Sequence, residues 1–422
     1  MCVAFPGVHG LLQRTKRGGG ERTIEVVRPV HRAWPAILIA AVLGAFPAAA
    51  SASRVLVLDR HGRTHVEDDR FLPATDLPPP PRATRVRAHG AKVRAGATRG
   101  ALQALLASGQ ITPADHQRRL SVYDTAVATR NSLGGRAGKE LGWVIENTDE
   151  LAQTGRLTAA RLEPVFLVLD RNREYWSSAG PIPSAGERIK FYGSLVLFQY
   201  YPGEGLQLQQ LANWGKVNAY LNSGLSSTAQ YLLNQLVPLG ANRDGGVAWE
   251  YYFHYGGGSP PWTSSLAQGT AIQALVHAAP QLRNDSYRSL ALRSLRPFQL
   301  PPPRGVRRMR GPGRAHYLIY SFAPRYYVAN AFIQSLNGLF DAGAPTLGNS
   351  APARRLFALG DRQARRELPL YDTGRWSRYS LSGETSTLSY HVLLRDFLRD
   401  LCDRTGTAVY CRYARKFTRY LR

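Results

Sequence analysis

The feature that most restricts the fold is a succession of helical segments from Gly100 to the end of the chain. The clearest helix follows Ser389, where apolar residues recur at the i, i+3, i+4, i+7 spacing of one buried stripe. Those apolar residues are Leu394, Phe397, Leu398 and Leu401. Thr112-Pro113 marks an earlier helix start, because proline is tolerated at the first helical position. Further helices are expected over residues 136–154, 157–173, 262–280, 284–295, 327–342, 350–367 and 407–420.

Most of these helices come in pairs joined by short turns, a pattern that favours antiparallel neighbours. Stretches rich in aromatic and β-branched residues interrupt them at Lys190–Gly205 and Gly245–Tyr255. The chain shows neither a βαβ alternation nor the period-2 pattern of a sandwich. The sequence therefore predicts a mainly α fold, an incomplete (α/α) toroid or barrel of paired helices with small β-hairpin inserts, over residues 100–422.

Residues 1–52 have the order of a secretory signal, although the true start of the protein could lie downstream of Met1. Arg28 and Arg32 precede a short apolar run that ends in the small residues Ala50-Ser51-Ala52. An uncleaved membrane anchor is the alternative, because the apolar run is close to spanning length. We expect a secreted or cell-envelope protein, anchored in the membrane only if the segment is retained. Residues 53–99, rich in proline and arginine, are predicted to be a disordered linker.

The chain carries a formal net charge of +25, most of it from arginine. Residues 1–52 hold six basic and two acidic side chains, so their removal would still leave +21. Guanidinium groups suit carboxylates and sulfates, and an exported protein meets acidic glycans rather than nucleic acid. The expected partner is therefore an acidic, uronate-containing polysaccharide, with no nucleic acid. The alternative is that the arginine content reflects coding bias alone. The oligomeric state is left open.

Cys402 and Cys411 lie close together in the sequence, between two predicted helices. In an oxidising compartment they could form a local disulfide, and two buried free thiols are the alternative. No Cys/His spacing resembles a metal site and no glycine-rich phosphate loop is present in the sequence, so no cofactor is expected.

A polar stretch, Leu368–His391, leads into the most periodic helix and reads LPLYDTGRWSRYSLSGETSTLSYH. It contains the tyrosines Tyr371, Tyr379 and Tyr390. A phenol on the inward face of a helix needs a hydrogen-bond partner or a cavity. Simple packing is the alternative for each of these tyrosines.

Three blocks of the sequence resemble the C-terminal domain of the D-glucuronyl C5-epimerases. The first is LPLYDTG followed by the Tyr390-His391 pair, the second is PPWTSSLAQGTAIQALVHA (Pro260–Ala278), and the third is PRYYVANAFIQSLNGLFD (Pro324–Asp341). They occur in the family's order, and the resemblance covers about residues 195–421. It implies a bacterial member of a family of enzymes that invert the C5 carbon of glucuronate units in heparan-type polysaccharides.

The resemblance implies that Tyr379, Tyr390, His391 and Tyr201 lie at the site, and the chemistry of other side chains adds the remaining candidates. The expected catalytic residues are Tyr379, Tyr390, Tyr201, His391 and Tyr320, and the expected substrate-binding residues are Arg375, Trp376, Trp262, Gln268, Asn330 and Tyr200. The tryptophans offer flat faces for sugar stacking, and the two amides could bind sugar hydroxyls or tie helix to helix. The role of Arg375, holding the sugar carboxylate, is inferred from charge alone.

Epimerisation at C5 requires proton transfer on both faces of the sugar and a cation to neutralise the carboxylate. An ionised tyrosine is a strong base because its ordinary pKa is about 10, and the interleaved arginines are expected to lower that pKa. Two alternatives remain open. A polysaccharide lyase shares the first proton abstraction, and a non-catalytic glycan-binding domain would keep the cleft without the chemistry.

The sequence departs from the family pattern at several positions. Ile319 stands where the family has a glutamate thought to transfer a proton, and Tyr320 is the nearest group that could replace it. Ser382 replaces a family arginine, and Leu388-Ser389 replaces a Trp-Asp pair. These departures favour the non-catalytic alternative and leave the substrate open.

Overall fold

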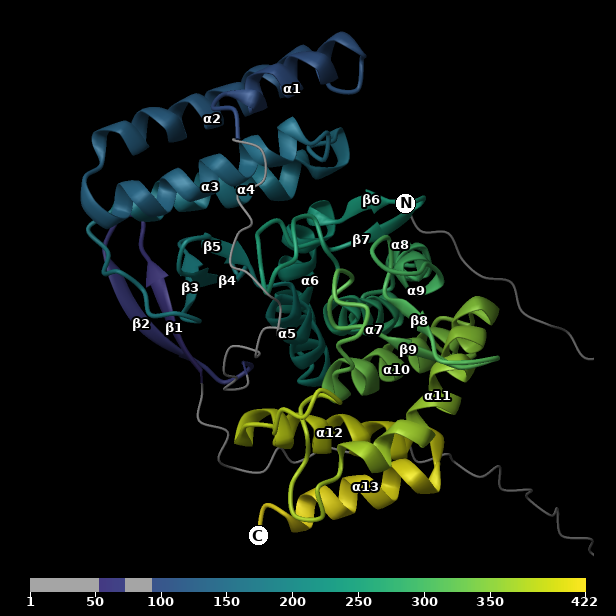
Figure 1. The fold of residues 1–422 in the computed structure, drawn as a ribbon. Helices are drawn as coiled ribbons and strands as arrows, with labels where there is room; N and C mark the ends of the chain where they lie inside the picture. Colours follow the sequence, from purple (N-terminus) through teal and green to yellow (C-terminus); the bar gives the residue numbers. More distant parts are fainter. Residues whose placement is uncertain (1–52, 73–92) are drawn as a thin grey trace, which may run out of the picture. The chain divides into compact units, whose positions relative to one another are not determined.

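The computed structural model describes residues 53–72 and 93–422, and this part of the chain is mainly helical, as predicted (Figure 1). The predicted signal region, residues 1–52, lies outside the described residues, as do residues 73–92 of the predicted linker. No helix within the described ranges combines the length and the apolar character that crossing a membrane requires.

The helices with predicted bounds begin and end within about four residues of them, except that α4 starts five residues later than expected, and α6 is not predicted from the sequence. They are α1 (Ala97–Ala107), α2 (Pro113–Ser132), α3 (Gly135–Gln153), α4 (Leu162–Trp176), α5 (Gln210–Asn222), α6 (Ser226–Leu236), α7 (Ser265–Gln281), α8 (Ser286–Arg293), α9 (Arg296–Gln299), α10 (Ala329–Gly343), α11 (Ala351–Tyr371), α12 (Leu388–Thr405) and α13 (Ala408–Arg419). Two short 3₁₀ turns, Ala159–Arg161 and Val237–Leu239, lie beside them. Thr112 caps α2 as expected, because its hydroxyl accepts a hydrogen bond from the Asp115 amide at 3.1 Å.

Four helices form a row in which each packs against the next: α5 against α7, α7 against α10, and α10 against α12. Each of them also packs against the helix that follows it in sequence, namely α6, α8, α11 and α13. Glycine permits the closest approach in this row, since a Cβ atom on Gly338 of α10 would meet the Gly269 carbonyl oxygen of α7 at 2.1 Å. The pairing of helices is thus observed, and closure of the row into a toroid stays a prediction.

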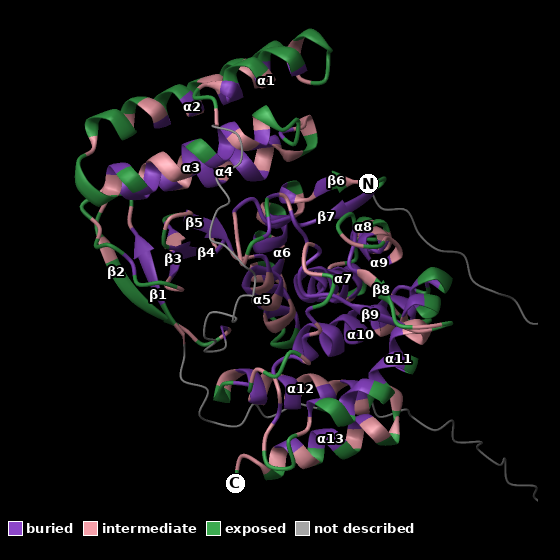
Figure 2. Ribbon diagram, in the orientation of Figure 1, coloured by how far each residue is buried: buried purple, intermediate pink, exposed green. Residues whose placement is uncertain are grey.

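Buried residues are concentrated in the helices of this row, as Figure 2 shows. Nearly every residue of α7 and α10 is buried, because helices packed on more than one side have no polar face to show to water. Helix α2, in contrast, buries only Arg119, Tyr123 and Ala126 and exposes most of its outer face.

A five-stranded sheet with the order β2-β1-β3-β4-β5 packs near α3 and α4. Its strands are β1 (Ser53–Leu58), β2 (Thr64–Asp69), β3 (Arg188–Phe191), β4 (Phe198–Tyr201) and β5 (Gly205–Leu208). Only β1 and β3 run parallel, with Val55 opposite Arg188. Two hairpins complete the β structure, β6 (Ala241–Arg243) with β7 (Gly246–Ala248) and β8 (Arg307–Met309) with β9 (Ala315–Tyr317). The predicted inserts at 190–205 and 245–255 therefore contain strands.

The prediction of a disordered linker over residues 53–99 is wrong for residues 53–69. Val55, Leu56, Val57 and Leu58 are all buried in β1, because this strand pairs with β2 on one side and β3 on the other. The partner strand β3 lies more than 130 residues away in the sequence, so no local pattern indicates the pairing. Helix α1 also begins at Ala97, inside the predicted linker.

The two cysteines are joined by a disulfide, which decides between the two alternatives that the sequence left open. Cys402 near the end of α12 bonds to Cys411 on α13, across a Cα–Cα distance of 4.8 Å. The bond closes a short loop that holds the last two helices together.

Replacing both cysteines by serine should lower the free energy of unfolding by about 2–3 kcal/mol, because a closed loop of this size restricts the unfolded chain. Guanidinium denaturation measures the change. Treating the unmodified protein with a reductant should lower its free energy of unfolding by a similar amount. An unchanged denaturation midpoint in both cases would show that the disulfide contributes nothing to stability.

Candidate active site

Ten aromatic residues from distant parts of the chain gather beside the row of helices, and we call them the aromatic cluster. They are Tyr201, Tyr251, Phe253, Tyr255, Trp262, Tyr320, Phe322, Tyr326, Tyr379 and Tyr390. They come from strand β4, the loop between β7 and α7, the loop between β9 and α10, the loop between α11 and α12, and the first turn of α12. Four of the five predicted catalytic residues are among them.

Tyr379 and Tyr390 contact each other within the aromatic cluster, with ring centroids 5.0 Å apart and planes at 62°. The loop that carries Tyr379 is fixed to the start of α10, because the Ala329 amide donates a hydrogen bond to the Tyr379 carbonyl at 3.1 Å. Tyr390 lies in the first turn of α12, where the Asn330 side-chain amide donates to its carbonyl oxygen at 3.0 Å. Helix α10 thus positions both tyrosines.

Tyr320 lies beside this pair and stacks on Tyr326, with centroids 6.2 Å apart and planes at 7°. The hydroxyl groups of Tyr320 and Tyr379 are buried, and within the described residues neither has a hydrogen-bond partner of acceptable geometry. Buried polar groups are normally satisfied, so these two phenols can offer hydrogen bonds to a polar ligand.

Arg188 on strand β3 is a buried cation that interacts electrostatically with Tyr390 and Tyr201, and the sequence does not predict it as a site residue. Its Nη1 donates to the Ser53 hydroxyl at 3.1 Å. Burial lowers the pKa of Arg188, while attraction to ionised Tyr390 and Tyr201 acts in the opposite direction. The sequence shows only an arginine in a short β-rich stretch, and nothing local places that arginine beside Tyr390.

Burial dominates the electrostatics of the phenols. It raises the pKa of Tyr379, Tyr320 and Tyr201 well above the ordinary tyrosine value. For Tyr201, the charge of Arg188 works against this rise without cancelling it. The expectation that nearby arginines lower the tyrosine pKa is therefore wrong for these three residues. At neutral pH they are protonated and can donate protons or hydrogen bonds.

Tyr200 lies outside the aromatic cluster, on the other face of β4 from Tyr201, because successive strand residues face opposite sides. Its hydroxyl donates to buried Glu140 and accepts from Arg136 at 2.9 Å. Burial and then the Glu140 carboxylate raise the pKa of Tyr200 to about 12. The structure gives Tyr200 a packing environment in the main core rather than a place at the site.

His391 and Trp376 also lie away from the phenols and join α12 to α13. Their rings stack with centroids 3.8 Å apart. The Phe417 carbonyl can only accept, so His391 Nε2 donates to it at 2.9 Å and Nδ1 accepts from the Ser377 hydroxyl at 2.8 Å. Burial lowers the pKa of His391, which keeps the ring neutral in this arrangement. Both nitrogen atoms are therefore engaged in structural contacts.

The remaining predicted binding residues divide between the site and the scaffold. Trp262 belongs to the aromatic cluster, but Tyr251 covers one of its faces at a centroid distance of 4.2 Å. Asn330 borders the cluster through its bond to Tyr390, and its Oδ1 is buried without a partner among the described side chains and backbone. Arg375 is exposed in the loop before α12. Gln268 is structural, since its amide donates to Val247 at 2.8 Å and to Ser294 at 3.0 Å.

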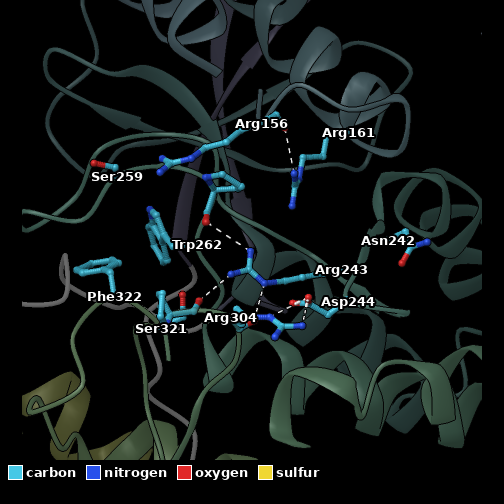
Figure 3. Close-up of a pocket in the computed structure, with 12 residues that line it drawn as sticks. Arg156, Arg161, Asn242, Arg243, Asp244, Ser259, Trp262, Arg304, Ser321 and Phe322 are labelled. Carbon is cyan, nitrogen blue, oxygen red and sulfur yellow. Dashed lines mark hydrogen bonds and ion pairs between the residues drawn. The ribbon is translucent and has the colours of Figure 1, made fainter. Parts of the chain in front are cut away.

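An open pocket of about 340 Å³ adjoins the aromatic cluster at Trp262 and Phe322 (Figure 3). Its walls also contain four arginines, Arg156, Arg161, Arg243 and Arg304. The phenols themselves are covered, since Tyr379 is 1% exposed and Tyr390 is 6% exposed. The partly exposed residues Tyr255 and Phe322 lie at the solvent edge of the cluster.

Replacing Gln268 by alanine should cost about 2–4 kcal/mol of stability, because two buried carbonyl groups would lose their donor. Guanidinium denaturation provides the measurement. Gln281→Ala, at the exposed end of the same helix, should change stability little. If Gln268→Ala left stability unchanged and weakened glycan binding instead, Gln268 would be a substrate-binding residue after all.

The C-terminal half of the chain matches a known family. Residues 243–419 fit the family described as D-glucuronyl C5-epimerase C-terminus. The D-glucuronyl C5-epimerase of Caenorhabditis elegans is 31% identical over 132 residues, which cover 29% of this chain and 21% of that enzyme. An uncharacterized protein of Methanocaldococcus jannaschii is 28% identical over 208 residues, covering 47% of this chain and 67% of that protein.

One solved structure, a D-mannose isomerase, aligns with a TM-score of 0.34 at 12% identity, covering 67% of this chain and 74% of that one. A likeness of this strength supports no inference. The family match contains Trp262, Tyr320, Tyr379 and Tyr390, whereas Arg188 and Tyr201 precede it. Through residues 243–419, the chain is therefore similar to the D-glucuronyl C5-epimerase C-terminal domain family.

Proposed function

We propose that this protein is a C5-epimerase that inverts glucuronate-type residues in an anionic polysaccharide. One observation carries the proposal: Tyr379 and Tyr390, from separate segments of the family domain, meet in one aromatic cluster with their rings 5.0 Å apart. The match to the epimerase family supports the same reaction class. The region shared with the C. elegans enzyme is about a fifth of that enzyme, so activity and substrate belong to this proposal.

The reaction removes the proton from C5, next to the sugar carboxylate, and returns a proton to the opposite face. The negative charge that develops on the carboxylate must be stabilised for the proton to leave. Arg188 is suited to this task, because a buried guanidinium binds a carboxylate through two parallel hydrogen bonds. In the proposal, Arg188 takes the role that the sequence analysis gave to Arg375.

The surroundings of the two tyrosines suggest different roles. Tyr379 is buried among uncharged aromatic rings, which keep its hydroxyl protonated. Tyr390 interacts with Arg188, a cation that favours the ionised form of a neighbouring phenol. We therefore assign Tyr390 as the base and Tyr379 as the acid for conversion of glucuronate, with the roles reversed in the return reaction. Tyr320 and Tyr201 border the pair and would hydrogen-bond to the sugar.

Access to the phenols requires movement at the solvent edge of the aromatic cluster. Phe322 lies directly over Gly258, where an added Cβ atom would meet its ring at 2.3 Å. The segment Tyr255–Gly258 and Phe322 thus cover the cluster together. In the proposal, the bound sugar displaces this cover and places its C5 between the hydroxyl groups of Tyr379 and Tyr390.

A second candidate function is glycan binding without catalysis. It is favoured by Ile319, a buried member of the hydrophobic surroundings of Tyr320, which has no group that can transfer a proton. Binding of a uronate polysaccharide with no exchange at C5 would support this function over the first.

Tyr390→Phe and Tyr379→Phe should each reduce exchange of C5 hydrogen with solvent deuterium by about 100-fold or more, because each removes one proton-transfer group. The exchange is measured by NMR on an unsulfated glucuronate polysaccharide in deuterated water. Tyr192→Phe, at an exposed tyrosine, is the matched control and should retain full activity. Unchanged exchange in Tyr390→Phe would remove Tyr390 from the mechanism. An unsaturated product that absorbs ultraviolet light would identify a lyase instead.

The exchange rate should not fall as the pH increases from about 6 to about 9, because the acid must keep its proton to act. The acid, Tyr379, has a pKa well above the ordinary tyrosine value, so it stays protonated throughout this range. A pH–rate profile without a falling limb is therefore expected in this range. A loss of activity on the alkaline side of neutrality, in protein that remains folded, would contradict the assignment of Tyr379 as the acid.

A further inference from the structure

The pocket beside the aromatic cluster is rich in arginine, and we call it the arginine pocket. Figure 3 shows Arg156, Arg161, Arg243 and Arg304 around it, with Trp262 and Phe322 forming its apolar wall. The arginines come from three separate segments: the turns after α3, strand β6, and the loop before β8. Convergence of distant segments on one hollow distinguishes this group from a run of charges along one exposed helix.

The charges around the arginine pocket are unbalanced. Arg161 and Arg243 both pair with Glu250, whose side chain is fully buried. Arg304 pairs with Asp244, which also lines the pocket. Arg156 instead donates to the Pro260 carbonyl at 2.7 Å, a neutral acceptor. Four guanidinium groups thus face two carboxylates, so the pocket carries a net positive charge.

The guanidinium groups also have hydrogen-bonding capacity to spare. Each carries five N–H donors. Arg161 places its Nε and Nη2 on Glu250 and its Nη1 on the Arg156 carbonyl at 3.0 Å. Arg156 makes a single side-chain hydrogen bond to the described part of the protein. These two arginines therefore have donors to offer a ligand.

The donors of Arg161 and Arg243 are held in place, whereas Arg156 and Arg304 are exposed at the rim. The side chains of Arg161 and Arg243 are only 14% and 11% exposed. Arg243 is fixed by Glu250 and by the carbonyl oxygens of Arg304, at 2.7 Å, and Pro303, at 2.8 Å. A fixed set of donors loses little freedom when an anion binds, and this favours a binding site over a purely structural network.

The arginine pocket continues from the aromatic cluster. Trp262 and Phe322 belong to both, and Tyr320 directly precedes Ser321, which lines the pocket. A pocket of about 340 Å³ lies at the lower end of the range for small-molecule sites and accommodates about one sugar unit. A polysaccharide with one unit at the phenols would therefore place a nearby unit at the arginines.

We propose that the arginine pocket is a subsite for one acidic group, a carboxylate or a sulfate, on a sugar near the unit that reacts. This inference rests on the proposed function, because it assumes that the glycan occupies the aromatic cluster. The subsite makes substrate selection depend on a charged group at a second position along the polysaccharide.

The test compares the protein with the double variant Arg156→Ala/Arg304→Ala. Neither arginine contacts Glu250 or the aromatic cluster through a hydrogen bond or ion pair, so the buried pairs of Arg161 and Arg243 remain intact. The control is Arg355→Ala, which removes the positive charge of one arginine from the exposed face of α11. Circular dichroism and thermal unfolding verify that each variant is folded, and the two single variants replace the double one if it is not.

Binding of an unsulfated glucuronate octasaccharide is measured by calorimetry, and turnover by deuterium exchange at C5. The double variant should bind about tenfold more weakly, with a higher KM and an unchanged kcat, because lost charge-assisted hydrogen bonds act on binding and not on proton transfer. Arg355→Ala should match the unmodified protein. An N-sulfated octasaccharide forms the second arm, since a larger loss of affinity for this probe in the double variant identifies sulfate as the preferred group.

Equal affinity of the double variant and the unmodified protein for both probes would overturn the proposal. An equal loss of octasaccharide affinity in Arg355→Ala would also overturn the proposal, because the effect would then come from the net charge of the protein. Failure of the proposed function gives a different result, in which the unmodified protein shows no exchange at C5. Octasaccharide binding that still depends on Arg156 and Arg304 would in that case support the subsite.

Discussion

The burial of several phenol groups in one place, beside one buried guanidinium, is the interaction on which the account of this protein depends. Removing tyrosine hydroxyls from water costs free energy unless they find partners, and the hydroxyls of Tyr320 and Tyr379 have none among the described residues. The scaffold supports this arrangement through α10, which bonds to the Tyr379 loop and to the first turn of α12. The close glycine contact between α7 and α10 sets the position of α10 in turn.

The proposed function uses residues from two parts of the chain. The tyrosines Tyr320, Tyr379 and Tyr390 lie in the region that matches the epimerase family, whereas Arg188 and Tyr201 come from the sheet that precedes it. Strand β1 pairs with β3, the strand that carries Arg188. The N-terminal strands therefore contribute indirectly to the site, by fixing the strand that holds its cation.

The sequence predicts most of the helices, because several have a regular apolar stripe or a recognisable cap, but it does not predict α6. It also predicts that Tyr379 and Tyr390 lie together, through family resemblance rather than through any local pattern. It fails where contacts depend on distant segments. Strand β1 finds its partner more than 130 residues away, and that partner, β3, carries Arg188 and pairs with β4 on its other side.

Prediction of the individual binding residues from the sequence is limited in the same way. Whether Tyr200 or Tyr201 faces the site depends on the strand register, which the sequence does not fix. His391 follows Tyr390 directly, yet the helix turns its ring toward Ser377 and Phe417. Gln268 carries an amide suited to a sugar, but this amide donates its hydrogen bonds to two backbone carbonyl groups instead. Chemical suitability of a side chain thus indicates a role only after its neighbours are known.

A crystal structure with a bound glucuronate oligosaccharide tests the central claim most directly. The account predicts that C5 of one glucuronate unit lies between the hydroxyls of Tyr379 and Tyr390, with its carboxylate on Arg188 and with Tyr255 and Phe322 displaced. A sugar bound elsewhere on the protein, with Tyr379 still covered and Arg188 still bonded only to protein groups, would contradict it.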